Sequence, residues 1–520
     1  MTGTEYGPVE FALVEEDAVE AAAAESGERP LSTRIGLAVV WGSLNSILLR
    51  LGGFVSGIIA ARIIAPRDFG VFAVALTVNA IIINVSSLGV TACIVRERDN
   101  PRSIAPTVAT ISIASSAALA VLTFAIAPFL ATQLGSAQAA WPIRIMSLNV
   151  LLAGIYAVPS ALLAREFRQG RMLVAELFNF GVATTVLIVL GLAGLGAYAL
   201  AWSYVAGTVI MTLLLTVLAP ARYWPGFNRK LAGPLLRFGL PLAGANLIAF
   251  SVYNVDYIVV GHILGSIPLG LYLLAFSISS WPSAVFNGMV TSVALPAFSR
   301  VRDDAERLPD YVATVVSALI GLALPISALT IVVARPAIVT VYGPRWAPAA
   351  AALATLALFG AVRVPAELFA NIVVALGRPR ALFFTQLLWL GLLIPTMILG
   401  VDKWGIKGAG IAHFVIAGAV VLPVYVFLVR SLSGVSIRRL AGAVTPPVLG
   451  SVAAAGAGAI AVHLVHDAAL ALLAGLGVGV VVYLALLGPW LLRVLRRARA
   501  LWGDVDTNVA PTDPTATLES

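Results

Sequence analysis

Ionisable side chains inside long apolar stretches are the residues of this sequence that could do chemistry. Arg363, Glu367 and Asn371 recur every four residues beside Pro365, so they share one face of a helix. A charge at the centre of a membrane costs about 2.5–3.5 kcal/mol on translocon-based scales, and it is a candidate functional group for that reason. Arg363 and Glu367 are predicted to form an internal ion pair, either as a structural brace or as a substrate contact.

Arg50 is a second intramembrane candidate. It shares a helix face with four small residues at steps of three and four: Ser43, Ser46, Gly53 and Gly57. This stripe predicts either an arginine that faces a polar cavity or a tight helix–helix seam with a buried ion pair, because small residues pack membrane helices closely.

Asp256 and Tyr253 belong to a third apolar stretch. Asp256 is a candidate partner of Arg50 or a proton or cation site, and the sequence leaves both open. Tyr253 is a candidate substrate contact. His413 is alone in its stretch and is interpreted as a packing residue with satisfied hydrogen bonds.

Composition places the whole chain in a membrane. Of its 520 residues, 60% are apolar and only 11% are charged, against roughly 25% charged in soluble domains. The single cysteine and four histidines give no disulfide framework and no metal-site spacing. A nucleotide-binding glycine loop is not found, and we expect neither a metal nor another cofactor. The fold is predicted to be an all-α integral membrane protein.

Fourteen apolar stretches are long enough to span a membrane at about 20 residues per helix. Their approximate ranges are 36–61, 69–94, 104–130, 142–164, 172–191, 196–219, 238–262, 269–297, 311–333, 348–375, 381–400, 405–429, 441–462 and 468–492. With the N-terminus inside, 24 basic residues fall in inner segments and six in outer loops. The positive-inside rule therefore predicts that both termini are cytoplasmic. The net charge of +8 is explained by these inner segments, and no nucleic-acid partner is expected.

A repeat organises these spans. Ala60–Leu76 and Val260–Phe276 align without a gap at a separation of 200 residues. Each copy joins two apolar stretches through a short turn that contains one proline, and Gly70 answers to Gly270. Because the second copy follows six spans, both halves insert in the same orientation, as in transporters with a substrate site between parallel repeats. Both turns are predicted to be extracytoplasmic rim segments, away from the binding site.

Six regions follow from this reading. They are a disordered acidic cytoplasmic tail (1–33), an N-terminal six-helix lobe (34–219), a cytoplasmic linker (220–234), a C-terminal six-helix lobe (235–430), two additional transmembrane helices (431–500) and a disordered cytoplasmic tail (501–520).

Several short motifs resemble one family. They are ARIIAPRDFGVF at 61–72, RFGLP at 237–241, NVD at 254–256, LGLY at 269–272, LPAFSR at 295–300 and ALGRP at 375–379. Together they resemble bacterial polysaccharide flippases of the O-antigen and exopolysaccharide type. These form the polysaccharide transporter branch of the multidrug/oligosaccharidyl-lipid/polysaccharide exporter superfamily. The similarity covers roughly residues 33–430 and carries no information on the sugar.

The resemblance implies a V-shaped plasma-membrane transporter that works by alternating access and is not an enzyme. Its cargo would be a glycan on polyprenyl pyrophosphate, moved from the inner to the outer leaflet for cell-surface polysaccharide synthesis. Membrane lipid and the lipid-linked glycan are the expected partners, with contacts to a glycan polymerase and other assembly proteins. Arg50 is the implied head-group residue. By analogy with lipid II flippases, the last two spans would hold the lipid tail.

Three alternatives remain at this point. A cation-coupled multidrug exporter of the same superfamily usually has twelve spans and an acidic residue in its N-terminal lobe cavity. A lipid II flippase shares fourteen spans but usually has more cavity arginines than this chain. A membrane polymerase or ligase of glycan assembly would need an extended outer loop, whereas no predicted loop exceeds roughly 18 residues.

Overall fold

The computed structural model describes residues 52–96, 101–166, 168–220, 224–289 and 306–507. In these ranges all regular elements are helices, which confirms the all-α prediction. Twelve helices are long and apolar enough to cross a membrane, and three shorter apolar helices accompany them: Gly52–Ile63, Asn254–Leu264 and Ser266–Ser280. The shorter helices at 52–63 and 266–280 lie in the predicted first and eighth spans, so the helices follow the pattern of about fourteen spans. The chain is a multi-pass membrane protein.

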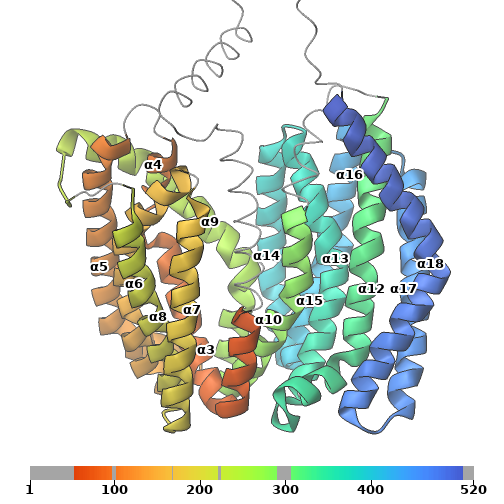
Figure 1. Cartoon of the computed structure of the whole chain (residues 1–520), viewed down its shortest axis with the longest axis horizontal. Helices are drawn as coiled ribbons and strands as arrows, with labels where there is room; N and C mark the ends of the chain where they lie inside the picture. The colour runs from red at the N-terminus through yellow and green to blue at the C-terminus, as the bar shows by residue number, and fades with distance from the viewer. Residues whose placement is uncertain (1–51, 97–100, 167, 221–223, 290–305, 508–520) are drawn as a thin grey trace, which may run out of the picture. The chain divides into compact units, whose positions relative to one another are not determined.

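The helices of Figure 1 follow the predicted spans with two departures. One helix already begins at Arg229, inside the predicted linker 220–234. The last helix continues to Thr507, inside the segment 501–520 that was predicted to be disordered. The helices are α3 (Pro66–Ser86), α4 (Ala92–Arg96), α5 (Pro101–Gln133), α6 (Ala140–Arg165), α7 (Gln169–Leu192), α8 (Ala197–Leu218), α9 (Arg229–Leu264), α10 (Ser266–Met289), α12 (Leu308–Tyr342), α13 (Ala349–Ala375), α14 (Pro379–Trp404), α15 (Ile406–Ile416), α16 (Leu422–Ser433), α17 (Ile437–Leu464) and α18 (Ala468–Thr507).

The chain forms two compact units. The first contains Val78–Ala127 and Trp141–Leu247, and the second contains Ile64–Thr77, Pro128–Ala140 and the chain from Ile248 onward. Helices α3, α5 and α9 therefore each contribute to both units.

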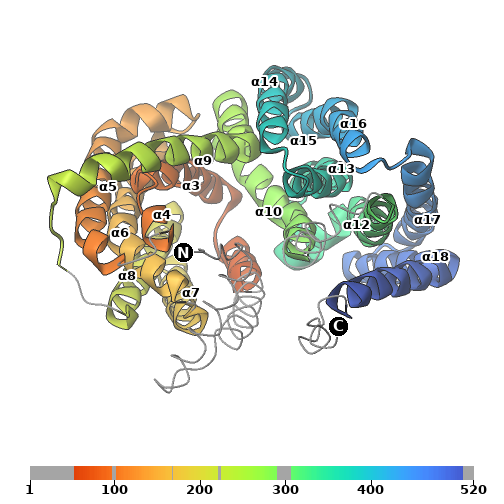
Figure 2. The ribbon, with the colours of Figure 1, turned by 90° about the horizontal axis from the view of Figure 1, so that it is seen from above.

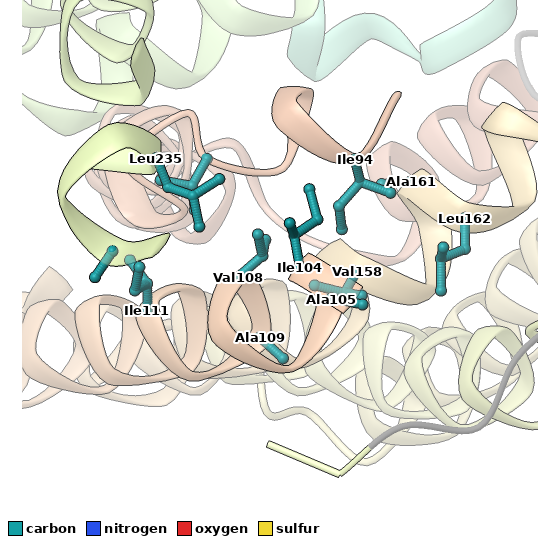
Figure 3. Close-up of a cluster of buried hydrophobic side chains, with 12 residues drawn as sticks. Ile94, Ile104, Ala105, Val108, Ala109, Ile111, Val158, Ala161, Leu162 and Leu235 are labelled. Atoms are coloured by element: carbon teal, nitrogen blue, oxygen red, sulfur yellow. The ribbon is translucent and has the colours of Figure 1, made fainter. Parts of the chain in front are cut away.

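The first unit has a close-packed apolar core at one end of α5. Side chains from α4, α5, α6 and the beginning of α9 converge there, among them Ile94, Val108, Val158 and Leu235 (Figure 3). Each of these four is at most 7% exposed. Their burial fixes the start of α9 against α5, and a backbone hydrogen bond from Gly226 N–H to the Pro106 carbonyl, 3.2 Å, holds the preceding loop to the same helix.

The predicted second span is interrupted near its end. Helix α3 ends at Ser86, and Leu88 and Gly89 adopt positive φ angles of 49° and 67° before α4 begins. Positive φ ends a right-handed helix. The carbonyl of Ser86 that the break leaves open accepts hydrogen bonds from the Ser115 and Ser116 hydroxyls of α5, at 2.5 Å and 3.2 Å.

Helix α13 is the central helix of the second unit. It packs against α10, α12, α14, α15 and α16, which surround it when the helices are seen from above (Figure 2). Helices α17 and α18 pack against each other and against α12 (Figures 1 and 2). Side chains of α13 that point toward these helices are therefore enclosed on several sides.

The predicted twelfth span is one helical path with a widened turn. Between α15 and α16 lies a π-helical turn, Ala417–Val421. Pro423, the second residue of α16, has no N–H to donate and would clash with the carbonyl four residues earlier in a regular α-helix. The wider turn accommodates this proline, and π-turns of this kind occur frequently at functional sites.

The two copies of the repeat contact each other within the second unit. A methyl group added to Gly70 would overlap the carbonyl oxygen of Ser266, and one added to Gly270 would lie 2.7 Å from the Gly70 backbone nitrogen. Glycine is therefore required at both positions, because the two backbones approach too closely for a Cβ atom. Phe69, next to Gly70, packs its ring edge-on against the fully buried Trp346, with ring centroids 5.2 Å apart.

Candidate functional site

Helix α13 carries the predicted ion pair. The Arg363 Nε donates to Glu367 Oε1 at 2.8 Å, and their side chains are 17% and 14% exposed. Asn371, one turn further, donates its Nδ2–H to the Glu367 carbonyl at 3.0 Å. The prediction of an internal ion pair is confirmed. Whether the pair contacts substrate stays a prediction.

A pocket of about 280 Å³ opens over this helix face. Helix α13 contributes Arg363, Glu367 and Asn371, and two further helices supply polar and aromatic groups: Gln386 and Trp389 from α14 and Tyr425 from α16. The buried Gln386 Oε1 accepts no hydrogen bond within the described part of the chain. The pocket therefore combines one neutralised ion pair, two amides and two aromatic rings inside an apolar helix bundle.

Sequence reasoning missed Gln386, Trp389 and Tyr425. Gln386 and Trp389 are three residues apart, so they lie on the same face of α14. An amide inside an apolar span was the signal that could have identified that face. Nothing in the sequence indicated that the pocket-lining faces of α14 and α16 meet α13.

Asp256 of α9 lies at a second centre, fully buried at 0% exposure. Its Oδ2 accepts a hydrogen bond of 2.6 Å from the Tyr272 hydroxyl of α10, and its Oδ1 accepts one of 3.0 Å from the Tyr257 backbone N–H. The Nε2 of His413, from α15, lies 3.7 Å from the same Oδ2. The carboxylate thus faces side chains from two other helices.

The interpretation of His413 as a satisfied packing residue is wrong. The residue is 2% exposed, yet neither ring nitrogen has a hydrogen-bond partner among the residues the structure describes. Its ring stacks on Phe359 of α13, with centroids 4.5 Å apart and the planes at 25°. The sequence showed one histidine in an apolar span and could not show that Asp256, more than 150 positions earlier, lies beside it.

Phe359 connects the two centres. One face of its ring stacks on His413, the Arg363 guanidinium carbon lies 5.9 Å from the ring centroid, and Trp389 approaches edge-on at 6.4 Å. Arg363 and Trp389 line the pocket. The pocket and the Asp256 centre are therefore neighbouring parts of one polar region in the second unit.

Two predicted site residues cannot be placed in this way. Arg50 lies outside the described residues, so the structure does not test its pairing with Asp256. Tyr253 lies on α9 one turn before Asp256, but its side chain is not among those described. Across the described ranges, no group of three or more histidine, cysteine or acidic side chains could hold a metal ion.

Residues 59–351 match the model of a family described as polysaccharide biosynthesis proteins. The chain belongs to this family. The resemblance seen in the sequence motifs is thereby confirmed, and similar proteins align with most of the chain.

Two of these relatives are named for polysaccharide synthesis. The succinoglycan biosynthesis transport protein ExoT of Rhizobium meliloti (strain 1021) is 28% identical over 465 residues, covering 86% of this chain and 92% of ExoT. The lipopolysaccharide biosynthesis protein WzxC of Escherichia coli (strain K12) is 22% identical over 409 residues, covering 77% of this chain and 82% of WzxC.

Solved transporter structures share the fold. The lipid II flippase MurJ in an inward closed conformation matches with a TM-score of 0.71 and 14% identity, over 87% of this chain and 99% of MurJ. An inward-facing multidrug resistance transporter of the MATE family matches with a TM-score of 0.60 and 16% identity, over 77% of this chain and 99% of that transporter. At these identities, the likeness shows a common helical fold.

Proposed function

We propose that this protein moves an oligosaccharide or polysaccharide unit linked to polyprenyl pyrophosphate from the inner to the outer leaflet of the bacterial plasma membrane. It acts by alternating access and serves the synthesis of cell-surface polysaccharide. The match to ExoT, which extends over most of both chains, carries this proposal. ExoT is named as a transport protein of succinoglycan biosynthesis.

The pocket over α13 suits part of a sugar chain. Amide and charged groups can bind hydroxyl groups, and an aromatic side chain such as Trp389 offers an apolar surface for a sugar ring. Binding sites commonly combine such apolar walls with a few placed polar groups. Because Arg363 is already paired with Glu367, the pocket presents no unbalanced charge and fits a neutral or hydroxyl-rich segment better than a pyrophosphate.

The last two spans offer a place for the lipid portion. A groove of about 720 Å³ between α17 and α18 is lined almost entirely by apolar groups, including Leu449, Ala453 and Leu486. Gly442 at its end also lines a polar pocket that contains Arg439 and Arg497. We assign the groove to the polyprenyl chain. Arg439 at its end is paired with Asp310 at 2.8 Å, so Arg497 is the basic group there that complements a pyrophosphate.

A transporter fits the connections between helices better than an enzyme does. The described connections on the side predicted to face outward are short: 134–139, 193–196, 343–348 and 465–467. A glycan polymerase or ligase would need an extended segment there. The same orientation places both termini in the cytoplasm, and contacts with a polymerase and other assembly proteins belong to this proposal.

The regions inferred from the sequence complete the proposal. Residues 34–219 and 235–430 are the two lobes, joined by the linker 220–234, and 431–500 are two added spans. The segments 1–33 and 501–520 are cytoplasmic tails. Arg50, Asp256, Tyr253, Arg363, Glu367 and Asn371 are the proposed substrate-binding set.

Deletion of the gene in its bacterial host tests the function. We expect loss of surface polysaccharide and accumulation of the lipid-linked unit on the cytoplasmic side, and the wild-type gene should reverse both effects.

Gln386→Leu tests the pocket. It removes a buried amide oxygen that has no partner in the described chain, so folding should not suffer, while export should fall at least about tenfold.

Thr396→Leu on the same helix is the matched control, because the hydroxyl of this half-buried threonine donates to the Leu392 carbonyl of its own helix and Thr396 does not line the pocket. It should export normally. A deletion strain that keeps its surface polysaccharide but becomes sensitive to cationic drugs would replace this proposal with a multidrug exporter. Normal export by Gln386→Leu would remove the pocket from the substrate path.

A further inference from the structure

The centre at Asp256 is built like a site that gains and loses a proton. A fully buried carboxylate faces a fully enclosed imidazole, with 3.7 Å between Asp256 Oδ2 and His413 Nε2. This distance is longer than a hydrogen bond, which has 2.7–3.2 Å between its heavy atoms. The structure thus shows the two groups close together and not yet bonded.

The His413 imidazole has no hydrogen bond within the described chain, which lowers the stability of the fold. A buried polar group without a partner destabilises a protein, and such exceptions in a native structure call for an explanation. A purely structural position would be filled at lower cost by an apolar side chain. The π-helical turn Ala417–Val421, which directly follows the helix of His413, is a second feature that occurs frequently at functional sites.

Charge balance points to the proton as the missing component. When ionised, Asp256 carries a negative charge that, among the described residues, accepts hydrogen bonds from the Tyr272 hydroxyl and the Tyr257 backbone N–H alone, and a poorly solvated charge is expensive inside an apolar helix bundle. A proton on His413 would make the pair neutral. Histidine is the side chain whose charge changes most readily near physiological pH.

The surrounding groups leave this role to His413. Tyr257 of α9 and Tyr272 of α10 are titratable neighbours that hydrogen-bond to Asp256, and the Arg363 guanidinium of α13 lies 5.9 Å from the ring of Phe359, on which His413 stacks. Arg363 is balanced by Glu367 at 2.8 Å. Helix α14 presents the non-titratable Trp389. His413 of α15 is therefore the described group in contact with Asp256 that can change charge near neutral pH.

We propose that Asp256 and His413 together bind one exchangeable proton, and that this proton is linked to occupancy of the pocket beside Arg363. A proton from water bonds to the Nε2 lone pair, and the resulting imidazolium donates that N–H to Asp256 Oδ2. Release of the proton to water restores the neutral ring and the ionised carboxylate. No other bond is made or broken.

The link to the pocket runs through Phe359. Closing the gap of 3.7 Å between His413 and Asp256 to hydrogen-bond length requires a movement of about 0.5–1 Å. His413 is stacked on Phe359, whose ring also contacts Arg363 and Trp389 of the pocket wall. Protonation and pocket shape therefore change together in a densely packed interior. This inference rests on the proposed transport function, in which the proton would be the ion that couples to glycan movement.

Nitrogen-15 NMR of histidine-labelled protein in lipid bilayers tests the site directly, because the chain has only four histidines. We expect the His413 signal, assigned by its loss in His413→Gln, to change from imidazolium to neutral imidazole between about pH 5 and about pH 8. In Asp256→Asn it should stay neutral over that range. The signals of His262, His463 and His466 should be the same in both proteins.

Asp310→Asn is the matched control, since Asp310 is an exposed carboxylate paired with Arg439. It should leave the His413 signal unchanged. If Asp256→Asn does not fold, Tyr272→Phe replaces it: loss of the hydroxyl donor strengthens the attraction of the carboxylate for the imidazolium, which should persist to higher pH. A His413 that keeps one charge state throughout, or that titrates alike with and without the Asp256 carboxylate, overturns the proposal.

Ala370→Trp tests the link to the pocket. Ala370 lines the pocket, so an indole at this position stands in for an occupant. The pH range of the His413 change should then move by about one pH unit or more, and an unchanged range refutes the link. These measurements need no glycan. They can refute the proton site while polysaccharide export by the wild-type protein is still observed, and a loss of the export proposal would leave the measured proton site unaffected.

Discussion

At the scale of single residues, the pair Arg363–Glu367 shows how a charge is kept inside an apolar bundle. Two opposite charges 2.8 Å apart cancel, whereas either one alone would be left poorly solvated. On an isolated helix, arginine followed by glutamate is the less favourable order for such a pair. Contacts with neighbouring residues, such as the Phe359 ring near the guanidinium, stabilise the pair in this bundle.

Removing one member of this pair should harm the protein more than removing both. Glu367→Gln takes the carboxylate away from the buried Arg363 and is expected to destabilise the fold by about 3–5 kcal/mol, whereas the double variant Arg363→Gln/Glu367→Gln removes both charges and should be closer to wild type. Thermal unfolding of the purified proteins in one detergent measures this. Equal losses in the single and double variants would indicate separate roles.

The residue scale also shows how far sequence reasoning reaches. Spacing alone placed Arg363, Glu367 and Asn371 on one helix face, because a helix repeats every 3.6 residues. The same reasoning failed for His413, whose neighbours Asp256 and Phe359 come from α9 and α13. Contacts between helices depend on how each is rotated and packed, and a single sequence carries no periodic signal for that.

At the scale of elements, the close contact of the two repeat turns is the most demanding feature. Gly70→Ala introduces a methyl group where the Ser266 carbonyl already lies. Overpacking of this kind costs about 1–3 kcal/mol, so Gly70→Ala and Gly270→Ala should both lower the unfolding temperature. Gly181→Ala is the control: a methyl group there meets nothing within 4 Å. An unfolding temperature unchanged by Gly70→Ala would show that the turns separate freely.

The groove between α17 and α18 gives a second prediction at this scale. Ala453→Phe should fill the groove and reduce polysaccharide export several-fold at unchanged protein level, because the groove is about 720 Å³ in volume and Ala453 lies in its wall. Val452→Phe adds the same ring one residue away on an exposed position, 66% accessible, and should export normally. Equal export by both variants would remove the groove from the lipid path.

At the scale of the whole molecule, the sequence determined the helical membrane class and the span pattern well. Long apolar stretches leave the backbone little choice but a helix, since hydrocarbon cannot satisfy its polar groups. What it could not supply were the interruptions: the break at Leu88 and Gly89 and the π-turn before Pro423. Both are changes in local backbone geometry, and hydropathy averaged over a span does not report such changes.

Membrane orientation is the prediction that belongs to this scale. In a Cys93→Ala background, Ile267→Cys in the second repeat turn should react with a membrane-impermeant maleimide in intact cells whose outer barrier has been opened. Ile437→Cys, at the basic start of α17, should react only after the inner membrane is permeabilised. Both side chains are well exposed, at 46% and 55%. The reverse pattern would invert the topology.

The contact between Gly70 and Gly270 joins equivalent positions of a duplicated segment. Equivalent residues meet in this way at the two-fold axis of a symmetric dimer, where a surface is its own partner. The single chain can therefore be regarded as two linked halves that share one self-complementary contact. Mutational drift at either glycine is restrained by the other copy, and the two halves made as separate polypeptides should recognise each other through this turn.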